Sequence, residues 1–305
     1  MADISASEID NVPRKPTVLS KIWRLLRKQP LGAVGFFIVL AMVLAALFAP
    51  LIAPFNPEEP NYEAILQGES WKHLLGTDEF GRDVLSRVIY GAQTALFVGL
   101  VASFVGATIG LVLGVASAYF GGLVDLFVQR ILDVFMAFPL IIIALVIVVV
   151  SKGLFPDAGQ QTQVLFVVIA ITIPFIPKCA RVVRSSALAI REIPYIDAAR
   201  ANGYSNSRII MRHMVPNVMA PFLIMLTAFV GQAILLEASL SFLGLGVNDP
   251  TPAWGLMLRT AQEYFENHPW VAIYPGFAIT LAVFGFNMFG DAVRDVLDPR
   301  LRSSQ

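Results

Sequence analysis

Long apolar runs alternate with polar connections along the whole chain. A helix needs about 20 predominantly apolar residues to cross the hydrocarbon core of a membrane, where lipid cannot satisfy exposed backbone groups. Six runs meet that length: Leu31–Ala53, Gln93–Phe120, Phe127–Val150, Gln163–Ala180, Val218–Leu243 and Trp270–Phe289. The pattern therefore predicts an all-α polytopic membrane protein with six transmembrane helices.

Few polar or helix-breaking residues lie inside these runs. The second run carries glycines at 99, 106, 110 and 114, and the fourth carries Pro174 and Pro177 near its predicted end. Ionisable residues are costly in lipid and often functional. Arg130 and Asp133, at the start of the third run, are candidate polar groups on a translocation path, although an internal pair or a place near the interface is the favoured interpretation for them. Glu237, inside the fifth run, is equally compatible with a polar group on a translocation path and with an internal contact.

The basic residues fall in alternate connections. The N-terminal segment, the connection between the fourth and fifth runs, and the C-terminus are rich in Lys and Arg, whereas the first and last connections are acidic on balance. Basic residues favour the cytoplasmic side of a membrane. Six spans with both termini in the cytoplasm satisfy every one of these biases.

Composition supports the same class. Of the 305 residues, 56% are hydrophobic and 14% charged, and the mean hydropathy is +0.70, far from the balance of a soluble protein. We therefore expect membrane lipid, and no nucleic acid, as a partner. The single cysteine, Cys179, excludes an intrachain disulfide and a cysteine-based metal site.

The charge and hydropathy pattern divides the chain into four parts. Residues 1–29 are predicted to be a cytoplasmic tail whose last part is a basic amphipathic helix at the membrane surface. Residues 30–92 hold the first span and a long extracytoplasmic segment. Residues 93–294 form a five-helix transmembrane domain with a polar loop at 185–216, and residues 295–305 are a second cytoplasmic tail.

Turn and helix-start residues occupy the end of the first connection. Gly76-Thr77-Asp78 and Phe80-Gly81-Arg82-Asp83 precede apolar residues at helical spacing, Val84, Leu85, Val88 and Ile89. An interfacial helix leading into the second span is predicted there. The nearby carboxylates do not follow the spacing of a calcium-binding loop, so no metal site is expected.

The most polar internal stretch, Tyr195–Pro216, is predicted to be a helix–turn–helix. Pro194 suits a first helical position, Ala198 and Ala199 leave a face with little bulk, and Gly203 suits a helix stop. Ser205 is expected to cap a second helix, which ends before Pro216. Spacing alone leaves two interpretations open: a knob for a cleft on another protein, or a loop whose arginines fix orientation.

Sequence motifs for catalysis are missing. No lysine follows a glycine, which excludes a phosphate-binding Gly-x-x-x-x-Gly-Lys loop, and neither His-Glu-x-x-His nor Gly-x-Ser-x-Gly occurs. We predict no catalytic residue, no metal and no cofactor in this chain. If nucleotide energises transport, another chain must hydrolyse it.

Several motifs resemble the permeases of type-I ATP-binding-cassette (ABC) importers. Asp197-Ala198-Ala199-Arg200-Ala201-Asn202-Gly203 is similar to their Glu-Ala-Ala…Gly coupling loop, with Asp197 in place of the usual glutamate. Leu75–Asp78, Gly81–Asp83, Glu237–Gly246, Pro250–Gly255 and the tail motif Gly290-Asp291…Asp298-Pro299 complete the resemblance. Together they resemble the C-type permease of dipeptide and oligopeptide importers over nearly the whole chain.

The resemblance implies a function and a set of partners. The partners are a homologous second permease, two cytoplasmic ATPase subunits that bind ATP and magnesium, and an extracytoplasmic solute-binding protein, in a bacterial or archaeal plasma membrane. It implies that the coupling loop contacts the ATPase; the residues concerned are Tyr195, Asp197, Ala198, Ala199, Arg200, Gly203, His213 and Pro216. Peptide is the implied substrate. The alternative is an ion- or proton-coupled secondary transporter that uses Glu237.

Overall fold

The computed structural model describes residues 30–297. The regular secondary structure in this range is helical, apart from one isolated bridge between Thr77 and Asp83, and irregular segments connect the helices. The helices, in chain order, are α2 (Pro30–Leu47), α3 (Ala49–Ile52), the 3₁₀ turn η2 (Tyr62–Ala64), α4 (Val84–Phe120), α5 (Gly122–Met136), α6 (Leu140–Leu154), α7 (Gln160–Arg191), α8 (Pro194–Ala201), α9 (Asn206–Ile209), the π-helical turn η3 (Ile210–Met214), α10 (Val215–Phe242), α11 (Trp254–Ala261) and α12 (Trp270–Leu297).

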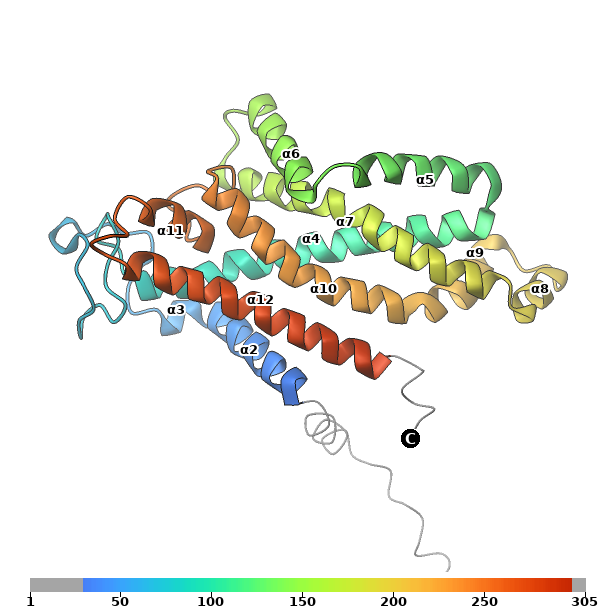
Figure 1. Ribbon diagram of the computed structural model, residues 1–305, viewed down its shortest axis with the longest axis horizontal. Coiled ribbons are helices and arrows are strands. Elements are labelled where there is room, and N and C mark those ends of the chain that lie inside the picture. The colour runs from blue at the N-terminus through green and yellow to red at the C-terminus, as the bar shows by residue number, and fades with distance from the viewer. Residues whose placement is uncertain (1–29, 298–305) are drawn as a thin grey trace, which may run out of the picture.

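Four long helices, α4, α7, α10 and α12, run along the length of the molecule, with α2 beside α12 (Figure 1). The short helices α8 and α9 lie at one end, and α11 and the long loop before α4 lie at the other. Within residues 30–297, five helices are long and apolar enough to cross a membrane, or six if the bent pair α5 and α6 forms one span. The six predicted apolar runs all correspond to these segments.

Glycines bring α4 against α7. A Cβ added to Gly106, Gly110 or Gly114 would lie 3.0, 2.8 or 2.6 Å from a backbone carbonyl oxygen of α7. Because these glycines recur every four residues, they lie on one face of α4, and small residues on such a face let two membrane helices approach closely. Gly99 meets the side chain of Ile234 on α10. The glycines of the second run therefore serve helix packing.

The third predicted span is not one straight helix. α5 and α6 meet at an angle of 89° across the break at Ala137–Pro139, and α6 packs on α7 at a different angle from α5 (Figure 1). Proline removes a backbone donor and disfavours helical geometry in the residue before it. The unbroken apolar run predicted one helix over 127–150, and Pro139 explains why the structure has two helices there instead.

Other helix ends also differ from the predictions. α7 continues to Arg191, beyond the predicted end at Ala180, with Pro174 and Pro177 in its interior. α4 begins at Val84, so the predicted interfacial helix and the second span form one helix of 37 residues. The first run is interrupted at Phe48, between α2 and α3. The apolar runs therefore give the length of each helix that lies in lipid, and polar residues continue the same helices beyond the membrane.

Candidate functional site

Helix α8 presents most of the predicted coupling residues at one end of the molecule. Pro194 lies in its first turn, as predicted, where a missing amide hydrogen costs nothing. Ile196 and Ala199 are buried in the core, with 0% and 5% of their surface exposed. Tyr195, Asp197, Ala198 and Arg200 are exposed. One face of α8 is anchored and the opposite face is free for contact.

The two alanines do not share a face, contrary to the prediction. Consecutive residues of an α-helix are about 100° apart. That rotation turns Ala199 into the core beside Ile196 and leaves Ala198 outside. Only Ala198 therefore provides a small side chain on the exposed surface.

Gly203 ends α8 as predicted. Its φ is +74°, in the left-handed region that glycine adopts without strain. The amide of Gly203 donates to the carbonyl of Arg200 at 2.9 Å, and that of Tyr204 donates to the carbonyl of Ala199 at 3.2 Å. This pair of bonds is the Schellman arrangement, and it turns the chain sharply towards α9.

The second helix of the segment does not end before Pro216. Residues Asn206–Phe242 form one continuous helical span in which Ile210–Met214 is a π-helical turn. Pro216 lies in the first turn of α10, and the widened turn just before it accommodates the missing amide hydrogen. Ser205 occupies the N-cap position of α9, but its hydroxyl contacts that of Ser207 rather than a backbone amide.

His213 joins α8 to the start of the α10 span. Its carbonyl accepts hydrogen bonds from the Tyr195 hydroxyl at 3.3 Å and from the Asn217 side chain at 2.6 Å. Its ring stacks on that of Tyr204, with the ring centres 6.1 Å apart. By contrast, the exposed pair of Asp197 and Arg200, at 3.1 Å, contributes little to stability.

Tyr119, at the end of α4, contacts both short helices. Its side chain is 8% exposed. Its hydroxyl donates to Asn206 of α9 at 2.8 Å, and the guanidinium of Arg200 on α8 lies 5.4 Å from the centre of its ring. Sequence reasoning missed this residue because 81 or more positions separate it from these partners on α8 and α9. Helix α8 is therefore in direct contact with α4, so a movement of α8 can be passed to α4 through Tyr119.

Replacing Tyr119 with Phe is expected to weaken this connection without unfolding the protein. The change removes one hydrogen bond of about 0.5–1.5 kcal/mol and keeps the ring beside Arg200. Because the sequence motifs resemble those of ATP-driven importers, we expect ATP-driven uptake to fall by about two- to tenfold while protein levels in the membrane stay normal. Transport and ATPase rates measured on the same preparation check this. Unchanged uptake would show that the hydroxyl has no role in transmission.

The three predicted intramembrane charges do not come together. Glu237 is 1% exposed and accepts a hydrogen bond at 2.7 Å from Ser241, one turn further along α10. Asp133 pairs with Arg181 of α7 at 2.5 Å rather than with Arg130. Arg130 is exposed and makes no ion pair within residues 30–297. Glu237 thus makes an internal contact, and no relay of charges links it to the other two.

A buried ionic network, which sequence reasoning missed, lies at the opposite end of the molecule. The Arg82 side chain, 3% exposed, binds Asp78 at 2.7 Å and Asp249 at 2.9 Å. Arg87 lies 3.4 Å from the same Asp78 and 3.6 Å from Asp249. Asp249 follows α10, so the network fastens the loop before α4 to the connection between α10 and α11.

Asp83 starts α4 in the predicted way. Its carboxylate accepts from the backbone amide of Ser86 at 2.8 Å, which caps the helix. It also contacts Nδ1 of His73 at 3.0 Å, and the His73 ring stacks on Phe55. Within residues 30–297, no group of three His, Cys, Asp or Glu side chains is arranged to hold a metal ion.

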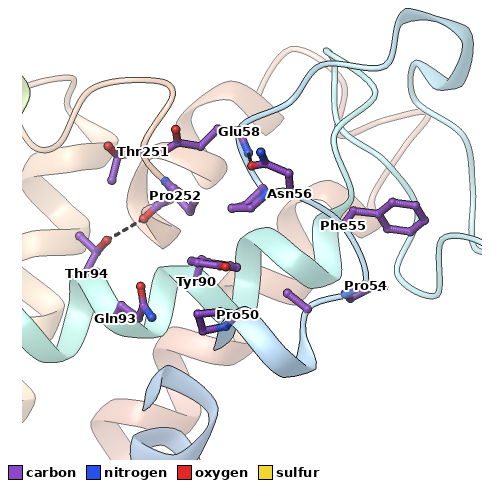
Figure 2. Close-up of a pocket in the computed structure, with 12 residues that line it drawn as sticks. Pro50, Pro54, Phe55, Asn56, Glu58, Tyr90, Gln93, Thr94, Thr251 and Pro252 are labelled. Carbon is purple, nitrogen blue, oxygen red and sulfur yellow. Dashed lines mark hydrogen bonds between the residues drawn. The ribbon is translucent and has the colours of Figure 1, made fainter. Parts of the chain in front are cut away.

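A cavity of about 650 Å³ opens beside this network. Figure 2 shows that Tyr90, Gln93 and Thr94 line it from α4, opposite the chain from Pro54 to Glu58. The Thr94 hydroxyl donates to the carbonyl of Pro252 at 2.8 Å, and the indole of Trp254 donates to Val88 at 2.9 Å. These bonds hold the connection to α11 against α4.

Glu79, at the edge of the network, gives a pH-dependent prediction. Burial, and secondarily the neighbouring Asp78, raise the pKa of its carboxyl, and the Arg82 guanidinium 3.5 Å away does not offset them. The folded protein therefore binds the Glu79 proton more tightly than the unfolded chain does, so this residue lowers stability as pH rises through the window above 4.5. Glu79→Gln is expected to raise the unfolding temperature at pH 7 and not at pH 4. An equal effect at both pH values would contradict this.

The fold and the α8 segment define a class: an all-α membrane transport subunit with an exposed helical knob at one end. Residues 106–303 match the family described as binding-protein-dependent transport system inner membrane component, and residues 17–68 match the N-terminal transmembrane domain of oligopeptide transport permease C. The chain belongs to this family of ABC importer permeases.

Relatives and a solved structure agree with that assignment. The dipeptide transport system permease protein DppC of Alkalihalophilus pseudofirmus is 41% identical over 281 residues, covering 92% of this chain and 90% of the relative. The glutathione transport system permease protein GsiD of Escherichia coli O6:K15:H31 is 38% identical over 283 residues, covering 92% and 90%.

An inward-facing structure of the MetNI methionine ABC transporter has a chain with the same fold, with a TM-score of 0.56 and 19% identity over 70% of this chain and 97% of that chain. The protein is therefore the permease subunit of an ABC importer, the type-I fold expected from the sequence is confirmed, and ATP hydrolysis belongs to separate subunits.

Proposed function

We propose that this permease imports di- or oligopeptides and that α8 is the element through which its ATPase drives it. The observation that carries the proposal is the geometry of α8: its inner face is buried and Ala198 is exposed. Arg200 of α8 lies over the Tyr119 ring of α4, and Tyr195 of α8 donates to the His213 carbonyl just before α10. Such a helix can move as one body with a protein that grips its outer face. The dipeptide and glutathione permeases among its relatives support a peptide substrate.

The end of the molecule that holds α8 faces the cytoplasm in this proposal. Arg191, Arg200, Arg208 and Arg212 gather there, and acidic residues dominate the connections at the α11 end. Both termini are then cytoplasmic, in a bacterial or archaeal plasma membrane. The cavity beside Tyr90 and the buried arginine network lie on the extracytoplasmic side.

The complex contains a second, homologous permease, two ATPase subunits and an extracytoplasmic solute-binding protein. Apolar side chains on α5 are largely exposed, with Leu123 at 83%, Phe127 at 68% and Val134 at 62%. A membrane protein can cover such a surface with lipid or with a partner permease. ATP and magnesium are bound by the ATPase subunits, and this chain needs no cofactor of its own.

ATP acts by stabilising one state of the assembly over the other. A ligand shifts a conformational equilibrium only by its difference in affinity for the two states. ATP closes the ATPase pair, the pair carries α8 with it, and the Tyr119 and His213 contacts pass the displacement to α4 and α10. The two permeases then alternate between inward-facing and outward-facing states.

Reconstitution tests the proposed function. The permease pair, the ATPases and the binding protein are placed in liposomes, and uptake of a labelled dipeptide is measured. We expect uptake only with ATP and the binding protein present. Uptake by the permease alone, driven by a proton or sodium gradient without ATP, would support the secondary-transporter alternative instead.

A further inference from the structure

Two cationic side chains converge on the turn that follows α10, Gly244–Asn248. The Lys152 ammonium, at the end of α6, donates to the carbonyl of Gly246 at 3.2 Å and lies 3.5 Å from the side-chain oxygen of Asn248. The Arg259 guanidinium of α11 covers Gly244 so closely that a Cβ there would lie 2.0 Å from it. Residues from three helices therefore meet at one turn.

Neither cation has a carboxylate partner within residues 30–297, since no ion pair forms at either one in this part of the chain. The carboxylate nearest in sequence, Asp249, is turned away to Arg82 and Arg87. The carboxylate of Glu237, in α10 just before the turn, already accepts a hydrogen bond from Ser241. Lys152 and Arg259 instead contact turn residues only two positions apart, Gly246 and Gly244, and like charges repel. No ion pair within residues 30–297 therefore offsets the positive charge at this turn.

The turn itself is fixed by hydrogen bonds. The Ser241 hydroxyl, which donates to Glu237, accepts from the amide of Val247 at 3.2 Å. The Asn248 side chain donates to Gln163 at the start of α7 at 2.5 Å, and Gln160 donates to the Thr251 hydroxyl. Glu237 therefore has a structural role: through Ser241 it holds the turn that Lys152 and Arg259 contact.

We propose that Lys152 and Arg259 bind the terminal carboxylate of the peptide substrate on the extracytoplasmic side of the permease. This inference rests on the proposed peptide-import function. A carboxylate is the complementary partner of a guanidinium fork and an adjacent ammonium, and such charge-assisted bonds are strong. Arg259 is exposed and Lys152 is half-buried, so an anion from outside can reach them. Every unmodified peptide carries this carboxylate, which suits a site that must accept many side chains.

Direct binding tests the site. The purified permease–ATPase complex without binding protein, in lipid nanodiscs with and without Mg-ATP, is titrated with labelled dialanine and with dialanine amide, which lacks the negative charge. We expect the wild type to bind the acid at least about tenfold more tightly than the amide in one of these states. Lys152→Gln and Arg259→Gln are expected to weaken the binding of the acid only, which brings the ratio of the two affinities close to one.

Lys72→Gln provides the matched control, because Lys72 is an exposed lysine with no ion pair among the described residues. It should keep the wild-type ratio. Equal binding of acid and amide by the wild type, no detectable binding of the acid, or a ratio unchanged in both variants would overturn the site. ATP-driven uptake by the reconstituted wild type is measured in parallel. Its absence would refute peptide import itself, whereas its presence without the acid preference refutes only this site.

Discussion

Ala198→Arg is expected to abolish ATP-driven uptake while the protein remains folded in the membrane. Ala198 is exposed on the outer face of α8, opposite the buried Ile196 and Ala199, so a larger side chain meets no neighbour within this chain. In the proposed coupling, α8 fits a groove on the ATPase, and such a groove cannot accommodate a long charged side chain at that position. Uptake should fall by more than about a hundredfold, the cost of losing roughly 3 kcal/mol of interface fit.

A conservative change at the same position is the control. Ala198→Ser adds one small polar atom and should keep most of the uptake. Membrane extraction and gel filtration establish that both variants are folded. Wild-type uptake by Ala198→Arg would remove α8 from the coupling mechanism, whatever else the permease does.

Arg82→Ala is expected to give the largest loss of stability in the chain. The side chain is 3% exposed and binds Asp78, also buried, as well as Asp249. Removing one partner of a buried ion pair typically costs about 3–5 kcal/mol, and here Asp78 would keep only the longer contact to Arg87, at 3.4 Å. We expect a markedly lower unfolding temperature in detergent, measured by thermal shift, and release of the α10–α11 connection from α4.

Two variants separate the loss of this network from a general loss of charge. Lys72→Ala removes an exposed cation only ten positions away and should leave the unfolding temperature unchanged. Asp249→Asn keeps the side-chain volume. Its unfolding temperature should lie between those of Lys72→Ala and Arg82→Ala, because Asp249 is half-exposed. An unchanged unfolding temperature for Arg82→Ala would mean that the network does not hold the α10–α11 connection in place.

Local physical rules accounted for much of the fold. Apolar length identified the membrane helices, because lipid forces the backbone to satisfy its own hydrogen bonds. Gly203 and Asp83 mark the end of α8 and the start of α4, where backbone conformation and capping are decided within a few residues. The class of protein followed from motifs at these same positions.

Features that depend on distant residues could not be predicted. The bond between Arg82 and Asp249 spans 167 positions, and the contact of Tyr119 with Asn206 spans 87. The break at Pro139 lies inside an unbroken apolar run, where hydropathy carries no information on direction. Which of Ala198 and Ala199 faces outward depends on the packing of Ile196, not on their identical side chains.

Photo-crosslinking tests the central claim, that α8 touches the ATPase. A benzoylphenylalanine residue is introduced at Ala198 in one variant and, as a control, at Trp71, whose side chain is 99% exposed at the other end of the molecule. Illumination of the assembled complex should join the Ala198 variant, and not the Trp71 variant, to the ATPase subunit. An ATPase adduct from Trp71, or none from Ala198 in a complex that hydrolyses ATP, would contradict the account.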